Sequence, residues 1–144
     1  MERTQDYSTH TRWHPIYHFV LAPLMLIHLI YTIVRLVQDP GWDRAEFVLL
    51  AVALVIITFL VRINPLKAQD RLIRLEEQLR ISKILPPDIA EKGMSLKASQ
   101  YIALRFAPDE ELEELITKID SGELKEAKEI KLAIKSWRGD YFRV

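Results

Sequence analysis

Cysteine is absent from this chain of 144 residues, and glycine occurs only four times. The lack of cysteine excludes disulfide bonds, thiol chemistry and thiolate metal sites. No glycine stands in a phosphate-binding loop and no serine in a nucleophile elbow, so neither nucleotide binding nor serine hydrolysis is indicated. A net positive charge is also lacking, because 20 basic residues balance 20 acidic ones. This balance argues against nucleic acid as a partner.

Two long apolar stretches, residues 15–37 and 45–64, dominate the N-terminal half of the chain. At about 1.5 Å per residue, residues 45–63 of the second stretch would extend roughly 28 Å, close to the hydrocarbon thickness of a bilayer. The first stretch is longer and more polar, because Pro23, His28 and Arg35 interrupt it. We therefore predict a transmembrane hairpin of two helices over residues 15–64. The alternative is a buried helical hairpin in a soluble protein.

The distribution of positive charge predicts the orientation of this hairpin. Cations follow the second stretch directly, whereas the single arginine of the connecting segment is accompanied by two aspartates. By the positive-inside rule, both termini are expected on the cytoplasmic side. These cations are Arg62, near the end of the second stretch, and Lys67, Arg71 and Arg74 beyond it.

The pattern predicts cytoplasmic segments on both sides of the hairpin. Residues 1–14 form a short N-terminal segment, and residues 65–144 form a helical domain. Residues 66–84 have the pattern of an amphipathic stalk helix, which could pair as a coiled coil or pack against the rest of the domain. Shorter helices are expected over residues 95–106, 108–119 and 124–137, with Ser95 as an N-cap. The predicted class is an all-α membrane protein with a hairpin, a stalk and a small helical cap. The apolar positions of the stalk are Ala68, Leu72, Leu75 and Leu79, and those of the later helices are Leu112, Leu115, Ile116, Ile119, Leu124, Ala127, Ile130, Ile134 and Trp137.

Three strings of the sequence resemble a known family. They are QDYSTHTRWHPIYHF at residues 5–19, QYIALRFAPDEEL at residues 100–112 and IKLAIKSWRGDYFRV at residues 130–144. Together they are similar to DUF6526, a family of bacterial two-span membrane proteins of unknown function. The resemblance covers nearly the whole chain and implies a two-span protein of the bacterial envelope. It implies no activity.

Histidines are the candidates for cofactor chemistry. His10, His14 and His18 recur every fourth residue, but Pro15 interrupts the helix that would bring them together, so no metal site is predicted. His28 lies near the middle of the first stretch, where an ionisable side chain is costly and should face protein, water or a cofactor. Its imidazole could form a hydrogen bond with Thr58 or could be the axial ligand of a haem or chlorin.

The C-terminal tail is the candidate interaction site. Its large aromatic side chains lie beside arginines, a composition typical of interface hot spots. The same side chains could instead close the core of the cap, or could lie with the lysine-rich face of residues 125–135 against the anionic inner leaflet. The residues concerned are Trp137, Arg138, Tyr141, Phe142 and Arg143.

The sequence thus predicts a non-catalytic membrane protein that acts by protein–protein interaction. The expected role is an accessory or scaffolding subunit of a bacterial membrane complex, with the lipid bilayer and another membrane subunit or its own copy as partners. No cofactor is required for this role. The alternative is a subunit of an electron-transfer, respiratory or photosynthetic complex that holds a haem or chlorin through His28.

Overall fold

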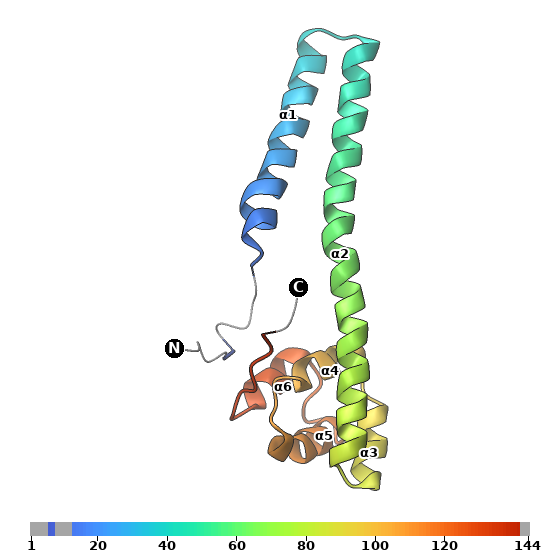
Figure 1. Cartoon of the computed structure of the whole chain (residues 1–144), viewed down its shortest axis with the longest axis vertical. Coiled ribbons are helices and arrows are strands. Elements are labelled where there is room, and N and C mark those ends of the chain that lie inside the picture. Colours follow the sequence, from blue (N-terminus) through green and yellow to red (C-terminus); the bar gives the residue numbers. More distant parts are fainter. Residues whose placement is uncertain (1–5, 8–12, 142–144) are drawn as a thin grey trace. The chain divides into compact units, whose positions relative to one another are not determined.

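The computed structural model describes residues 6–7 and 13–141, and every regular element in this part of the chain is a helix. The all-α class is therefore confirmed. Among the described residues, 13–66 form a first compact unit, and 67–141 together with 6–7 form a second. The elements, in order, are the π-helix η1 (Ile16–Leu21), α1 (Ala22–Gln38), α2 (Trp42–Ile84), α3 (Pro87–Met94), α4 (Ala98–Leu104), the 3-10 helix η2 (Asp109–Glu111), α5 (Leu112–Asp120) and α6 (Ala127–Ala133) (Figure 1).

The first apolar stretch begins with a π-helix directly before its proline. The backbone N–H of Ala22 donates to the carbonyl of Tyr17, five residues earlier, instead of four. Pro23 follows at the start of α1 and has no N–H to donate. The irregularity expected at this proline therefore takes the form of a widened turn on its N-terminal side.

Most apolar side chains of the first unit are exposed. Together, η1 and α1 (Ile16–Gln38) and, separately, α2 are long and apolar enough to cross a membrane by length and composition. Among the described residues of this unit, the buried ones are small: Thr32 on α1, and Ala51 and Thr58 on α2. The large exposed side chains include Leu24, Ile27, Ile30, Val34, Val37, Phe47, Leu49, Leu50, Ile56, Ile57, Phe59, Leu60 and Val61.

The second unit, which contains the part of α2 beyond Leu66, has a conventional apolar core. The short helices α3 to α6 gather beside this part of α2 (Figure 1). The predicted face of α5 is confirmed, because its four apolar residues are all buried. The core consists of Ile81, Leu96, Tyr101, Ala103, Leu104, Phe106, Ala107, Leu112, Leu115, Ile116, Ile119, Ile130 and Ile134.

Close packing at Gly93 fixes α3 against α2. A Cβ atom at this position would lie 2.7 Å from Cγ2 of Ile81, which is far inside the van der Waals distance. Ile81 is itself fully buried. Glycine at position 93 therefore allows the two helices to approach each other more closely than any other residue would.

Two of the expected helices in this unit have different limits. Ser95 is not the N-cap of the next helix, because its hydroxyl donates to the Lys92 carbonyl and α4 begins only at Ala98. The last helix, expected to continue to Trp137, ends at Ala133. Ile134 then adopts an extended conformation (φ −68°, ψ 123°). The expected apolar positions of this segment still pack on the core, although the helix carries only some of them.

Candidate functional site

The C-terminal tail packs on the core of its own unit. The indole of Trp137 stacks on the buried Phe106 ring, with ring centroids 4.9 Å apart and an interplanar angle of 30°. The backbone N–H of Arg138 donates to the Phe106 carbonyl at 2.8 Å. Tyr141 is 64% exposed, and the Arg138 side chain is also exposed. Phe142 and Arg143 lie outside the described residues.

A second link to this tail is an ion pair that the sequence patterns do not predict. Nε of Arg105 lies 3.3 Å from the Asp140 carboxylate, and both side chains are largely buried. The Arg105 guanidinium also lies 4.6 Å from the centre of the Phe106 ring. A charged residue inside the otherwise apolar string at residues 103–106 was the signal for such a partner.

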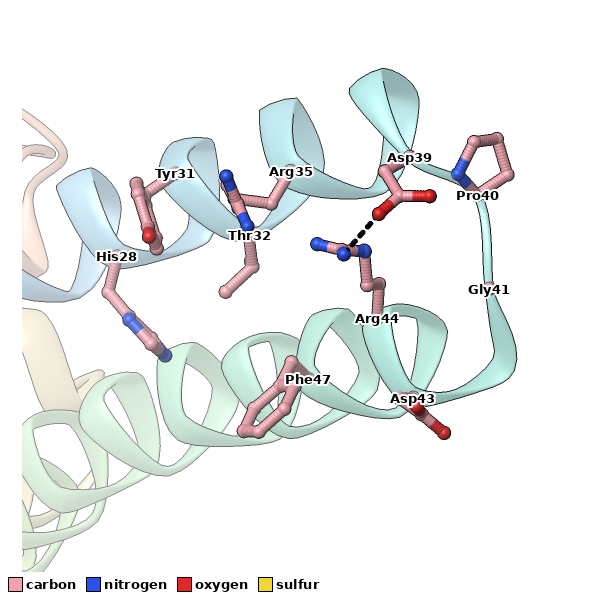
Figure 2. Close-up of a pocket in the computed structure, with 10 residues that line it drawn as sticks. All are labelled: His28, Tyr31, Thr32, Arg35, Asp39, Pro40, Gly41, Asp43, Arg44 and Phe47. Carbon is pink, nitrogen blue, oxygen red and sulfur yellow. Dashed lines mark hydrogen bonds and ion pairs between the residues drawn. The ribbon is translucent and has the colours of Figure 1, made fainter.

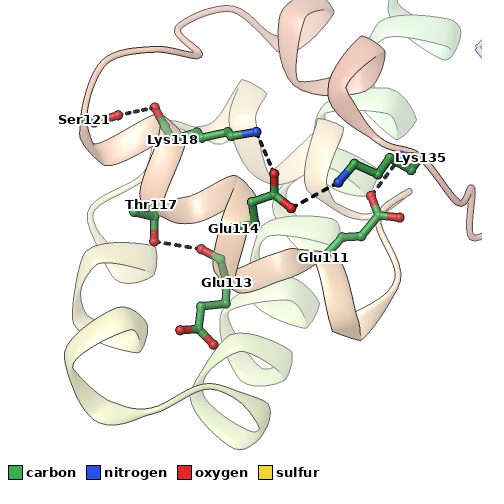
Figure 3. Close-up of polar contacts among 7 residues, drawn as sticks. All are labelled: Glu111, Glu113, Glu114, Thr117, Lys118, Ser121 and Lys135. Atoms are coloured by element: carbon green, nitrogen blue, oxygen red, sulfur yellow. Dashed lines mark hydrogen bonds and ion pairs between the residues drawn. The ribbon is translucent and has the colours of Figure 1, made fainter.

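Glu111 binds the chain where α6 ends. Its carboxylate accepts hydrogen bonds from the backbone N–H groups of Lys135 at 2.9 Å and Ser136 at 2.8 Å. Figure 3 shows Glu111 and Glu114 directed toward Lys135, whereas the Glu113 carboxylate points away from it. The carboxylate thus satisfies two backbone donors that continuation of the helix would otherwise have used, which explains why the tail leaves the helical path.

An ion-pair network that is buried at Glu77 and Arg80 and exposed at Asp109 joins α2 to η2 and to the loop before it. Nη1 of Arg80 lies 3.1 Å from the Glu77 carboxylate, and the two side chains are 10% and 7% exposed. The same guanidinium donates from Nε to Asp109 at 2.7 Å and from Nη2 to the Ala107 carbonyl at 2.8 Å. Burial raises the pKa of Glu77, and the Arg80 charge opposes this rise.

The leucine stripe of α2, which we define as Leu72, Leu75 and Leu79, lies away from the core. Their exposed fractions are 55%, 54% and 52%. The opposite face of the helix, with Ile73 and Ile81, is the buried one. The expectation that the stripe packs against the rest of its own domain is therefore wrong, because α3 to α6 use the other face.

His28 lines a pocket of about 640 Å³ in the first unit. Tyr31, Thr32 and Arg35 of α1 and Arg44 of α2 also line it. Figure 2 shows the imidazole of His28 directed toward α2. The hydroxyl of Thr58 donates to the Leu54 carbonyl of its own helix at 2.8 Å, and not to His28 as one alternative expected.

Local backbone contacts occupy His14, just before η1, and His18, within it. The backbone N–H of His14 lies 3.1 Å from Nδ1 of His18, and the N–H of Tyr17 donates to Nδ1 of His14 at 3.3 Å. His10 lies outside the described residues. Among the residues that the structure describes, no group of three or more histidine, aspartate or glutamate side chains could hold a metal ion.

Comparisons with known proteins bear on this architecture but not on a reaction. No curated protein and no solved structure matches the chain. The sequence does match a family described as "Family of unknown function (DUF6526)" over residues 1–144. Because this match extends over the whole chain, the protein belongs to the DUF6526 family.

Proposed function

We propose that the protein is a multi-pass protein of the bacterial inner membrane, with residues 15–64 inserted as a hairpin and both termini in the cytoplasm. The exposed apolar side chains of α1 and of the N-terminal part of α2 support insertion, because water would not tolerate so large an apolar surface. Contacts at both ends support a hairpin. Asp39 pairs with Arg44 beside the turn, and the Arg62 guanidinium lies 5.9 Å from the centre of the Tyr17 ring.

The absence of native cysteine allows a direct test of this topology. Gly41→Cys places a thiol in the connecting turn, and Glu123→Cys places one on an exposed position of the C-terminal unit. In intact spheroplasts, a membrane-impermeant maleimide should label Gly41→Cys only, and both variants should react after lysis. Labelling of Glu123→Cys in intact spheroplasts would contradict the proposed orientation. Extraction of the wild-type protein at alkaline pH would contradict insertion.

Within that membrane, the proposed role is non-catalytic: an accessory or scaffolding subunit that binds another membrane subunit or a second copy of itself. The leucine stripe carries this proposal. Leu72, Leu75 and Leu79 lie on one face of α2 beyond the apolar stretch, and each remains more than half exposed. Burying the exposed part of each against a partner helix would contribute about 1 kcal/mol. The spacing of the three leucines matches that of helix pairing.

The size of the complex in mild detergent tests this role. We expect the native protein to migrate well above its 16.9 kDa mass in native electrophoresis. Leu75→Glu should shift it toward the monomer, because a charge in a helix-pairing seam opposes association. Leu132→Glu is a matched control, since Leu132 is 58% exposed on α6. Equal effects of the two variants, or none, would argue against the stripe as the interface.

The alternative function is that of an electron-transfer subunit holding a haem or chlorin through His28. The observation that favours it is the position of the imidazole in a pocket lined by both apolar helices. His28 would supply one axial ligand from each chain, so a second copy or another subunit would provide the other.

A further inference from the structure

The pocket beside the connecting turn contains a cation that has no acidic partner. Among the residues that the structure describes, Asp39 pairs with Arg44, and no hydrogen bond or ion pair involves the Arg35 guanidinium. Figure 2 shows the Arg35 side chain on the Thr32 side, away from Asp39. It also shows the Asp43 carboxylate directed away from the space between the helices. The pocket is therefore lined by two guanidinium groups and two aspartates, of which Asp39 is engaged by Arg44 and Asp43 points its carboxylate away.

We propose that this pocket binds the phosphate of an anionic phospholipid headgroup. The inference rests on the proposed membrane insertion, which would place the connecting turn at the level of the headgroups. Arginine binds phosphate with two parallel N–H donors, and Arg35 is the group that would do so. The hydroxyl of Tyr31 and the imidazole of His28 line the same pocket and can donate hydrogen bonds to phosphate or glycerol oxygens.

The size and surroundings of the pocket fit an amphiphile. Its volume of about 640 Å³ falls within the range of small-molecule sites and exceeds what a phosphate ion alone needs. Exposed apolar side chains continue from the pocket along both helices, among them Ile27 at 63%, Ile30 at 54% and Leu50 at 51%. A phospholipid whose headgroup occupies the pocket could lay its acyl chains along these side chains. A soluble anion would leave them uncovered.

Native mass spectrometry of the full-length protein tests the proposal. Delipidated protein in detergent is mixed with phosphatidylglycerol, with phosphatidylcholine or with inorganic phosphate. We expect retention of one phosphatidylglycerol, at least about tenfold weaker retention of phosphatidylcholine, and no retention of inorganic phosphate alone. Arg35→Gln should weaken phosphatidylglycerol binding about tenfold. Arg35→Lys keeps the positive charge but loses the pair of parallel N–H donors, so its affinity should lie between those of the wild type and Arg35→Gln.

Arg62→Gln is the matched control, because this arginine also flanks an apolar stretch but lies outside the pocket. It should bind phosphatidylglycerol as the wild type does. Equal binding by the Arg35→Gln and wild-type proteins, or equal retention of the two lipids, would overturn the proposal. If inorganic phosphate were retained as strongly as the lipid, the bound phosphate would not need to come from a lipid, and this part of the proposal would be overturned. Resistance of each variant to alkaline extraction is measured separately, so a failure of insertion is distinguished from a failure of headgroup binding.

Discussion

The ring of Trp137 stacks on the ring of Phe106 at a centroid distance of 4.9 Å, and this contact joins the two most distinctive strings of the sequence. Residues 100–112 supply Arg105, Phe106 and Glu111, and residues 130–144 supply the groups that bind them. The ring stack, the Arg105–Asp140 ion pair and the Glu111 hydrogen bonds all lie along the same stretch of chain. These strings therefore mark the site where the tail closes the second unit. In the following predictions, the cap means this whole unit from residue 67 to residue 141, including its part of α2.

Removing either ring should destabilise the cap, and the buried ring should matter more. Phe106 is fully buried, so Phe106→Ala should lower the free energy of unfolding by about 3–5 kcal/mol. Trp137 is only partly buried, so we expect a smaller loss from Trp137→Ala, roughly 1–3 kcal/mol. Urea unfolding in mild detergent, followed by circular dichroism, measures both. A Trp137→Ala protein of wild-type stability that no longer forms its native complex would instead make Trp137 an interface residue.

Glu111 should hold the tail through its two backbone hydrogen bonds. Glu111→Ala leaves the N–H groups of Lys135 and Ser136 without this acceptor, and we expect a loss of about 1–3 kcal/mol. Glu113→Ala is the control, because Glu113 is exposed and its carboxylate points away from the tail (Figure 3). Its effect should stay within about 0.5 kcal/mol. Amide hydrogen exchange at residues 135 and 136 should increase only in the Glu111 variant.

Glu77 should give the cap a stability that falls as pH rises above 4.5, because burial raises the pKa of this carboxyl from that value. Between the unfolded and folded pKa values the native state binds more protons than the unfolded chain, so deprotonation favours unfolding. The charges around it are those of Arg80, Arg138 and Glu76. Glu77→Gln removes the titrating group, so its stability should lack this decline.

Two other carboxyls act in the opposite direction and in a different pH range. Hydrogen bonds from Lys118 and Lys135 lower the pKa of Glu114, and those from the backbone of Glu126 and Lys125 lower the pKa of Glu129. Their contributions to stability are lost as pH falls below 4.5, and they are the same in the wild type and in Glu77→Gln. The comparison therefore uses the difference between wild type and Glu77→Gln in urea midpoints from about pH 4 to about pH 8. Parallel curves would contradict the assignment.

The sequence patterns predicted the helices better than the contacts between them. Apolar spacing identified the buried face of α5, because its residues repeat at the helical period. The same spacing identified the leucine stripe but left open whether it packs on its own domain or pairs with another helix. Both faces of this part of α2 carry large aliphatic residues, with Ile73 and Ile81 opposite the leucines, and periodicity does not tell which face a later segment covers.

The end of α6 shows a second kind of limit. Residues 124–137 keep a helical apolar spacing throughout, so local sequence predicts that the helix continues. It ends at Ala133 because the Glu111 carboxylate, more than 20 residues earlier, accepts the next free N–H groups. Such a contact depends on the tertiary fold. The pocket at His28 is similar, because its opposite wall comes from α2 and no local pattern on α1 indicates Arg44.

A visible absorption spectrum distinguishes the scaffolding role from the cofactor-holding one. We expect protein purified from its native membrane in mild detergent to be colourless, because a lipid headgroup in the proposed site would occupy the pocket that His28 lines. His28→Ala should then leave the spectrum, the native complex and the resistance to alkaline extraction unchanged. A Soret or chlorin band in the wild type that His28→Ala abolishes would instead establish axial ligation by this imidazole. In that case, Thr32→Val is the control for a general disturbance of the pocket. Its hydroxyl donates to the Leu29 carbonyl of its own helix, so it should keep the band.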